Sequence, residues 1–232
     1  VEKQRNNGIY LTVLGFGMGN YKDNKLETIA DKGNGNYAYI DNSQEAHKVF
    51  IKEFGGTLYT IAKDVKLQVE FNPQKVKAYR LIGYENRALN DEDFNNDKVD
   101  AGDIGAGHQV TALYEVTPVG SPATLNDPLR YATNDTAKND SDEVAFLRVR
   151  YKAPGARSSQ LIETPIMAGD ATEAGFAAAI AGFGQLLRGS DYLGDWSFAD
   201  AIALASATKG DDPYGYRTEA VQLMRLAQSL SR

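Results

Sequence analysis

A glycine-rich turn stands between an apolar run and a predicted helix in VLGFGMGNYKDNKLE, residues 13–27. Such a turn binds the pyrophosphate of a dinucleotide when its glycines follow the spacing G-x-G-x-x-G. Gly15 and Gly17 occupy the first two positions, but the third position is Asn20. No Gly-Lys-Ser/Thr follows, as a P-loop requires, and the predicted helix begins around Asp23, beyond the glycines. The pattern therefore predicts a structural turn and no nucleotide site.

Residues 90–103, NDEDFNNDKVDAGD, form an acidic segment whose oxygen-bearing side chains suit calcium. Three residues match the first ligand positions of an EF-hand loop: Asp91, Asp93 and Asn95. The glycine that this loop needs is Asn96, and the position of its closing glutamate is Gly102. Because the sharp turn and the bidentate carboxylate are missing, we predict a solvated loop with Asx turns and no metal site.

The residues that most often act in catalysis are scarce. His47 and His108 are the two histidines, and Ser158–Ser159 lacks the glycines of a nucleophile elbow. No acid–base–nucleophile pattern surrounds either histidine in the sequence. We therefore expect no catalytic residue, no cofactor-binding residue and no enzyme activity.

Aromatic residues are plentiful, with 13 Tyr and 9 Phe, and they offer stacking platforms for sugars. Tyr79, Tyr114 and Phe146 fall in predicted strands, where packing alone favours aromatic side chains. Trp196 precedes a predicted helix and suits a hydrophobic staple. Packing is the expected role, and a small-molecule or carbohydrate-binding module is the alternative function.

Composition narrows the classes of protein. The 232 residues are 42% hydrophobic and 24% charged, which is typical of a globular chain with a core. A net charge of −6 disfavours nucleic acid and anionic membrane surfaces as partners. No apolar run approaches the roughly 18 residues that span a bilayer, and cysteine is absent. No signal peptide opens the sequence, and VEKQRNN is not typical of a natural start, so we expect residues upstream of it.

Residues 1–56 alternate predicted strands and helices, which occupy 8–17, 23–33, 35–41 and 43–56. Ser43 is the expected N-cap of the last helix, whose inward face comprises Ala46, Val49, Phe50 and Phe54. Two parallel strands with two helices form only half of a doubly wound sheet. We therefore expect a partial α/β domain.

Residues 57–167 change to a period of two, which predicts an antiparallel β-sandwich. Its strands are expected at 65–71, 76–85, 108–116, 143–152 and 159–167, with surface loops at 90–107 and 117–142. In the first of these strands one face should be buried, namely Leu67, Val69 and Phe71. Its opposite face should be exposed, namely Lys66, Gln68 and Glu70.

Residues 168–232 predict a helical bundle of three helices. Asp170 or Thr172 is the expected cap of the first helix and Ser197 of the second. Gly189 and Gly210 stand where helices end. The overall prediction is a multi-part α+β protein divided into residues 1–56, 57–167 and 168–232.

Two long motifs resemble a known family. Residues 12–50, TVLGFGMGNYKDNKLETIADKGNGNYAYIDNSQEAHKVF, resemble the last third of a von Willebrand factor type A domain. Residues 83–116, GYENRALNDEDFNNDKVDAGDIGAGHQVTALYEV, resemble the extension of bacterial type A domain proteins of largely unknown function. FGQLLRGS and GYRTEAVQLMRLA continue this match. The resemblance implies the C-terminal portion of such a protein.

Type A domains that bind ligands usually do so through a divalent metal held by an Asp-x-Ser-x-Ser motif. No such motif occurs in this sequence, so the residues do not fit the family's metal site, which belongs to an upstream half. The resemblance implies a non-enzymatic interaction or scaffold protein of the bacterial cell envelope, exported or lipid-anchored. Its partner is expected to be another protein. The strand at 8–17 should either pair with the same strand of a second molecule or leave its type A position.

Overall fold

A computed structural model describes residues 1–5, 7–17, 22–83, 88–99, 101–123, 141–169 and 174–231. The chain is a mixed α/β protein that divides into two compact units. The first unit comprises Val1–Glu70, Leu89–Gln109 and Phe146–Thr164, and the second comprises Phe71–Ala88, Val110–Ala145 and Pro165–Arg232. The predicted division into three domains, with boundaries at residues 56 and 167, remains a prediction.

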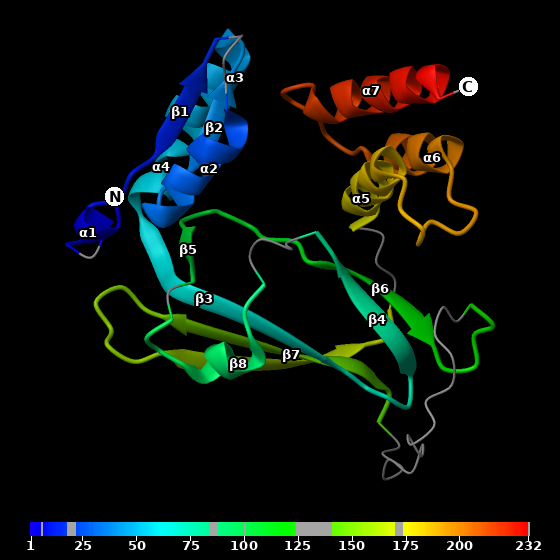
Figure 1. Cartoon of the computed structure of the whole chain (residues 1–232), viewed down its shortest axis with the longest axis horizontal. Helices are drawn as coiled ribbons and strands as arrows, with labels where there is room; N and C mark the ends of the chain where they lie inside the picture. Colours follow the sequence, from blue (N-terminus) through cyan, green and yellow to red (C-terminus); the bar gives the residue numbers. More distant parts are fainter. Residues whose placement is uncertain are drawn as a thin grey trace. The chain divides into compact units, whose positions relative to one another are not determined.

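A small parallel sheet lies in the first unit, after the short helix α1 (Glu2–Arg5). Strand β1 (Val13–Phe16) pairs in parallel with β2 (Tyr37–Ile40), and helix α2 (Asp23–Lys32) packs against both strands (Figure 1). The predicted parallel pairing and the start of the helix at Asp23 are confirmed. Strand β1 is shorter than the predicted strand at 8–17, and residues 8–12 lie outside it.

The turn before β2 needs glycine for a steric reason. A Cβ atom on Gly35 would lie 1.9 Å from the main-chain oxygen of Leu11. The Leu11 N–H also donates to the Gly33 oxygen at 3.0 Å. This close approach of two backbones is what allows the chain to enter β2 directly beside β1.

The prediction of one regular helix at 43–56 is wrong. It consists of helix α3 (Ser43–His47), a π-helical segment η1 (Lys48–Lys52) and helix α4 (Phe54–Leu58). The wider π turn rotates the following residues away from the predicted face, so Phe50 and Phe54 are exposed rather than inward. The N-cap is Asn42 instead of Ser43, and its side chain accepts from the Glu45 N–H at 2.8 Å.

Six strands follow. Four of them form one sheet in the order β5-β3-β7-β8, and two form an antiparallel pair, β4-β6. Their bounds are β3 Thr60–Phe71, β4 Val76–Ile82, β5 Gly102–Gly105, β6 Leu113–Pro118, β7 Glu143–Lys152 and β8 Gln160–Met167. Strand β7 matches its predicted bounds, whereas β5, at the end of the acidic segment, was not predicted.

The predicted exposure of β3 is wrong at its centre. Lys66 is 2% exposed, whereas Leu67 is 51% exposed. The strand contains an irregularity between Ala62 and Val65, where Asp64 adopts a positive φ of 51°. Such a bulge breaks the simple alternation of faces. The outward prediction for Glu70 agrees with the structure.

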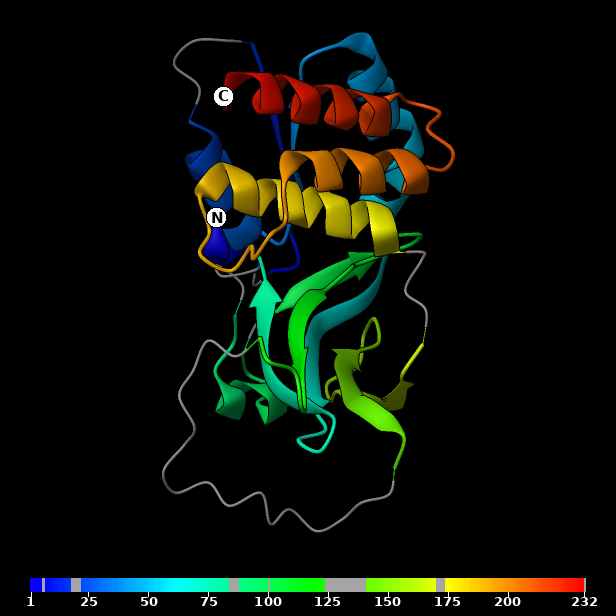
Figure 2. The same cartoon turned by 90° about the vertical axis from the view of Figure 1, so that its right-hand side faces the viewer.

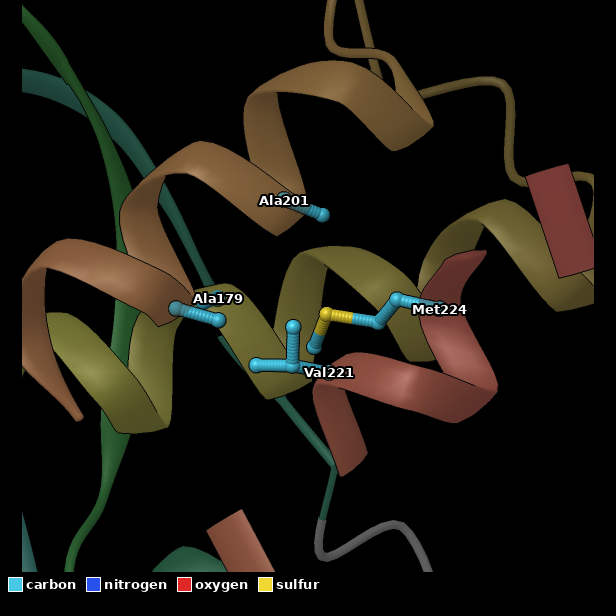
Figure 3. Close-up of a cluster of buried hydrophobic side chains, with 5 residues drawn as sticks. Ala179, Ala201, Val221 and Met224 are labelled. Atoms are coloured by element: carbon cyan, nitrogen blue, oxygen red, sulfur yellow. The ribbon is translucent and has the colours of Figure 1, made fainter. Parts of the chain in front are cut away.

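Three helices in the second unit share a buried core. Helices α5 (Gly175–Arg188), α6 (Phe198–Thr208) and α7 (Tyr216–Leu230) lie side by side (Figures 1 and 2). Their core comprises Ala179, Ala201, Ala205, Val221 and Met224 (Figure 3). Small alanine side chains let the helices approach, and Met224 fills the space between them.

Local capping predictions hold for two helices. Ser197 caps α6 in a reciprocal capping box with Asp200, and Gly189 ends α5 with a left-handed φ of 65°. Gly210 follows α6 with a φ of 59°. Helix α5 has Ala174 at its N-cap position, while Asp170 and Thr172 lie outside the described residues.

Candidate functional site

The acidic segment at 90–103 is joined to β3 and β7 by hydrogen bonds, while Asp91, Glu92 and Asn96 are exposed as predicted for a solvated loop. Its first residues form a 3₁₀ helix, η3 (Asp91–Asn95), with Phe94 buried beneath it. The ammonium group of Lys66 donates to the main-chain oxygens of Asp93 at 2.9 Å and Asn96 at 2.6 Å. A buried lysine therefore supplies a positive charge to carbonyl oxygens of this loop.

Strand β7 supplies two further cations to the same loop. Lys152 Nζ lies 2.7 Å from both Asp64 Oδ2 and the Asp97 main-chain oxygen. The Arg150 guanidinium donates to Asn95 Oδ1 at 3.1 Å and lies over the Phe94 ring. Side-chain cations thus bind loop oxygens that, in a calcium loop, would face the ion.

Asp97 closes the loop onto the start of β8. Its carboxylate accepts the Ser159 N–H at 3.2 Å. Hydrogen bonds from the Ser159 hydroxyl and then from its N–H hold the pKa of Asp97 below its usual value. Within the described ranges, no group of three or more His, Asp or Glu side chains is arranged to hold a metal ion.

The two histidines lie in separate places. His47 ends helix α3, and His108 is an exposed residue after β5. The His108 ring packs closely on Gly56. A Cβ atom added to Gly56 would lie 2.7 Å from the Nε2 atom of His108. Both histidines stay predicted structural or surface residues.

The predicted aromatic platforms are also distributed over the fold. In the second unit the Phe71 ring contacts Tyr79 and Tyr114, with centroids 4.4 and 5.3 Å away. Phe146, in the first unit, lies beneath the Arg148 guanidinium at 5.0 Å. Trp196 packs against the core of the three helices. This core includes Ala201, the residue that Trp196 would contact in a hydrophobic staple.

The surface that sequence reasoning placed at 8–17 is the free edge of β1. Val13 donates its N–H to the Asn36 oxygen at 2.8 Å, so Val13 faces β2. Main-chain groups of alternate residues point to opposite sides of a strand, and the N–H groups of Leu14 and Phe16 therefore point away from β2. Among the residues the structure describes, β1 and β2 form a sheet of only two strands.

Large apolar side chains in the part of the chain that contains β1 and β2 are exposed in unusual number. Between residues 9 and 61 the large exposed apolar side chains are Ile9, Leu11, Phe16, Ile29, Phe50, Ile51, Phe54, Leu58, Tyr59 and Ile61. Over the same range the buried hydrophobic residues are Ala30 and Ile40. We call the ten exposed side chains the exposed apolar set. A parallel strand is ordinarily covered on both faces, and in β1 the Phe16 side chain is left exposed.

A family model described as "Uncharacterized protein YfbK, C-terminal" matches residues 56–230. The chain belongs to this YfbK C-terminal family. It is 48% identical over 236 residues to the "Uncharacterized protein YfbK" of Escherichia coli (strain K12). That match covers 100% of this chain and 41% of the relative, so the chain spans about two fifths of the relative's length.

A solved structure is also similar, a von Willebrand factor type A protein from Catenulispora acidiphila. The match covers 93% of this chain and 50% of that chain, with 16% identity and a TM-score of 0.40. A TM-score at this level carries no argument for a shared fold. The structure also has no described helix with the length and apolar character that a membrane crossing needs.

Proposed function

We propose that this chain is a non-enzymatic interaction or scaffold protein, and that the free edge of β1 receives a strand from a partner polypeptide. The observation that supports it most is an open parallel strand with an exposed Phe16, in a part of the chain that leaves the exposed apolar set in solvent. The proposal keeps the type A resemblance, with residues 1–56 as the end of such a domain. The rest then forms a sandwich and a helical bundle in a protein of the bacterial envelope.

The driving force for such binding is large enough to matter. Burying one large apolar side chain contributes about 1.5–3 kcal/mol. Phe16 is 60% exposed and belongs to the strand whose outer N–H groups face away from β2. A partner strand would satisfy these main-chain groups and cover apolar side chains at once, which is how strand addition achieves affinity.

The partner strand can come from two sources. Most of the length of the E. coli relative lies outside the segment that this chain matches, and a longer protein would supply the strand from there. In the absence of that segment, the same edge of a second copy is the available partner, since open apolar edges associate readily.

Light scattering coupled to size-exclusion chromatography tests the proposal. We expect the mass of the protein to rise above that of one chain as concentration increases. Phe16→Lys should keep the protein monomeric, because charge on an edge strand opposes pairing. Leu187→Lys is the matched control, since Leu187 is 61% exposed but lies in α5.

The control should associate as the unchanged protein does. A protein that stays monomeric at every concentration, or a Phe16→Lys variant that associates normally, would refute the proposal.

A further inference from the structure

A charged cavity of about 320 Å³ lies in the first unit. Strand β3 contributes Lys63 and Asp64, β7 contributes Lys152, and the acidic segment contributes Asp97 and Lys98. Tyr10 is its one aromatic lining residue. Cavities that hold small ligands measure about 300–1,000 Å³, so this one has room for a small molecule.

The acidic groups of the cavity already have partners within the protein. Asp64 Oδ2 accepts from Lys152 at 2.7 Å, and Asp64 Oδ1 accepts the Ala101 N–H at 3.4 Å. Asp97 Oδ2 accepts from Ser159, and Asp103 Oδ1 accepts the Asp64 N–H at 3.2 Å. Each of the three carboxylates therefore takes part in the frame of the cavity, although no group in the described part of the chain donates a hydrogen bond to the buried Asp103 Oδ2 atom.

The frame includes unusual backbone. The described non-glycine residues with a positive φ are Asn34, at 47°, and Asp64, at 51°. Both line this cavity. Residues held in this region of φ cluster at binding sites, where the surrounding structure maintains them, and a bulge in β3 is what aims the Asp64 carboxylate.

Positive charge is in excess over negative charge around the space that remains. Among the residues that the structure describes, the lining contains four Lys or Arg side chains against three Asp, a balance of +1 in a chain whose net charge is −6. The Lys63 ammonium donates to the Tyr10 hydroxyl. That bond raises the pKa of Lys63, burial partly opposes the rise, and Tyr10, Asp103 and Asp64 add to it electrostatically. Lys98 is an exposed residue of the lining.

We propose that this cavity binds a small polar molecule through a carboxylate or phosphate group, with Lys63 and Lys98 as its cationic contacts. The positive balance of the lining, in which Arg5 is added to three lysines against three aspartates, favours an oxyanion. The lining lacks aliphatic side chains, which selects against apolar ligands. The proposal goes beyond the interaction function and does not depend on it.

Isothermal titration calorimetry at low ionic strength tests this site. Inorganic phosphate and succinate are the two probes, and sodium chloride at matched ionic strength measures unspecific screening. We expect saturable binding of at least one probe, and the probe that binds shows whether phosphate or carboxylate is recognised. Lys98→Glu should weaken that binding at least tenfold. Because Lys98 is exposed, its replacement is compatible with folding.

Lys25→Glu is the matched control, because it makes the same charge change on helix α2 outside the cavity lining. It should bind the probe as the unchanged protein does. Lys63→Gln should also weaken binding, with circular dichroism as the check on its fold. No saturable heat from either probe, or equal affinities for Lys98→Glu and Lys25→Glu, would overturn the proposal.

Discussion

The Lys66 ammonium group lies among main-chain oxygens of the acidic segment. It is bound by the carbonyl oxygens of Asp93 and Asn96, and its side chain is almost completely withdrawn from water. A buried charge is costly unless hydrogen bonds compensate it. The buried ammonium group therefore depends on these two loop oxygens, which also accept the N–H groups of Asn96 and Val99 respectively.

Replacing this lysine tests the pairing. Lys66→Met keeps the length of the side chain but removes two hydrogen bonds from the ammonium group to loop carbonyls, and a hydrogen bond from a charged group contributes about 1.5–3 kcal/mol. We expect a net loss of about 2–4 kcal/mol in the free energy of unfolding, measured by urea denaturation. Lys77→Met, on an exposed position of β4, should change it by less than about 0.5 kcal/mol. Equal midpoints for the two variants would contradict the account.

Sequence alone could not identify Lys66 as buried. A strict alternation over 65–71 puts lysine outward, and that rule assumes a regular strand. The bulge around Asp64 and the packing of η3 decide the face, and both depend on residues far away in the sequence. The failed EF-hand match was informative, because the loop had oxygens but lacked the glycine and glutamate of an ion site.

At the scale of elements, glycine decides how closely α5 approaches its neighbours. A Cβ on Gly175 would lie 2.5 Å from Thr208 Cγ2, and a Cβ on Gly182 would lie 2.5 Å from Trp196 Nε1. Gly184, in the same helix, has open space at that position. Packing therefore requires glycine at positions 175 and 182 of α5, but not at position 184.

This difference predicts opposite effects of the same substitution. Gly182→Ala should destabilise the protein by about 1–3 kcal/mol, because the Trp196 ring must move. Gly184→Ala should stabilise it by about 0.5–1 kcal/mol, because alanine favours the helix and meets no neighbour. Thermal unfolding of the two variants measures both changes. A stabilising Gly182→Ala would show that Trp196 does not pack as described.

Helix ends were more predictable than helix regularity. Ser197, Gly189 and Gly210 act through neighbours within a few residues, so a local pattern is enough. The π-helical segment at Lys48–Lys52 leads into helix α4, which packs against a strand distant in sequence. Gly56 of α4 lies against the backbone of Gly105, and a Cβ on Gly105 would lie only 1.7 Å from the Gly56 oxygen. A period of 3.6 contains no information about that contact.

At the scale of the whole molecule, apolar side chains are unevenly buried. Helices α5, α6 and α7 share a buried core, whereas residues 9–61 leave the exposed apolar set in solvent. The chain also spans about two fifths of its E. coli relative. Sequence reasoning reached this expectation from the count of strands and helices, because a doubly wound sheet needs more strands than residues 1–56 contain.

Amide hydrogen exchange at single residues of β1, followed by NMR from low to high protein concentration, tests the central claim most directly. The Val13 amide bonds to β2 and should be protected throughout. The amides of Leu14 and Phe16 face away from β2 and should exchange fast in dilute protein. Their exchange should slow at least tenfold as the protein associates. If Leu14 and Phe16 keep the same exchange rate while light scattering shows association, the free edge of β1 is not the binding surface.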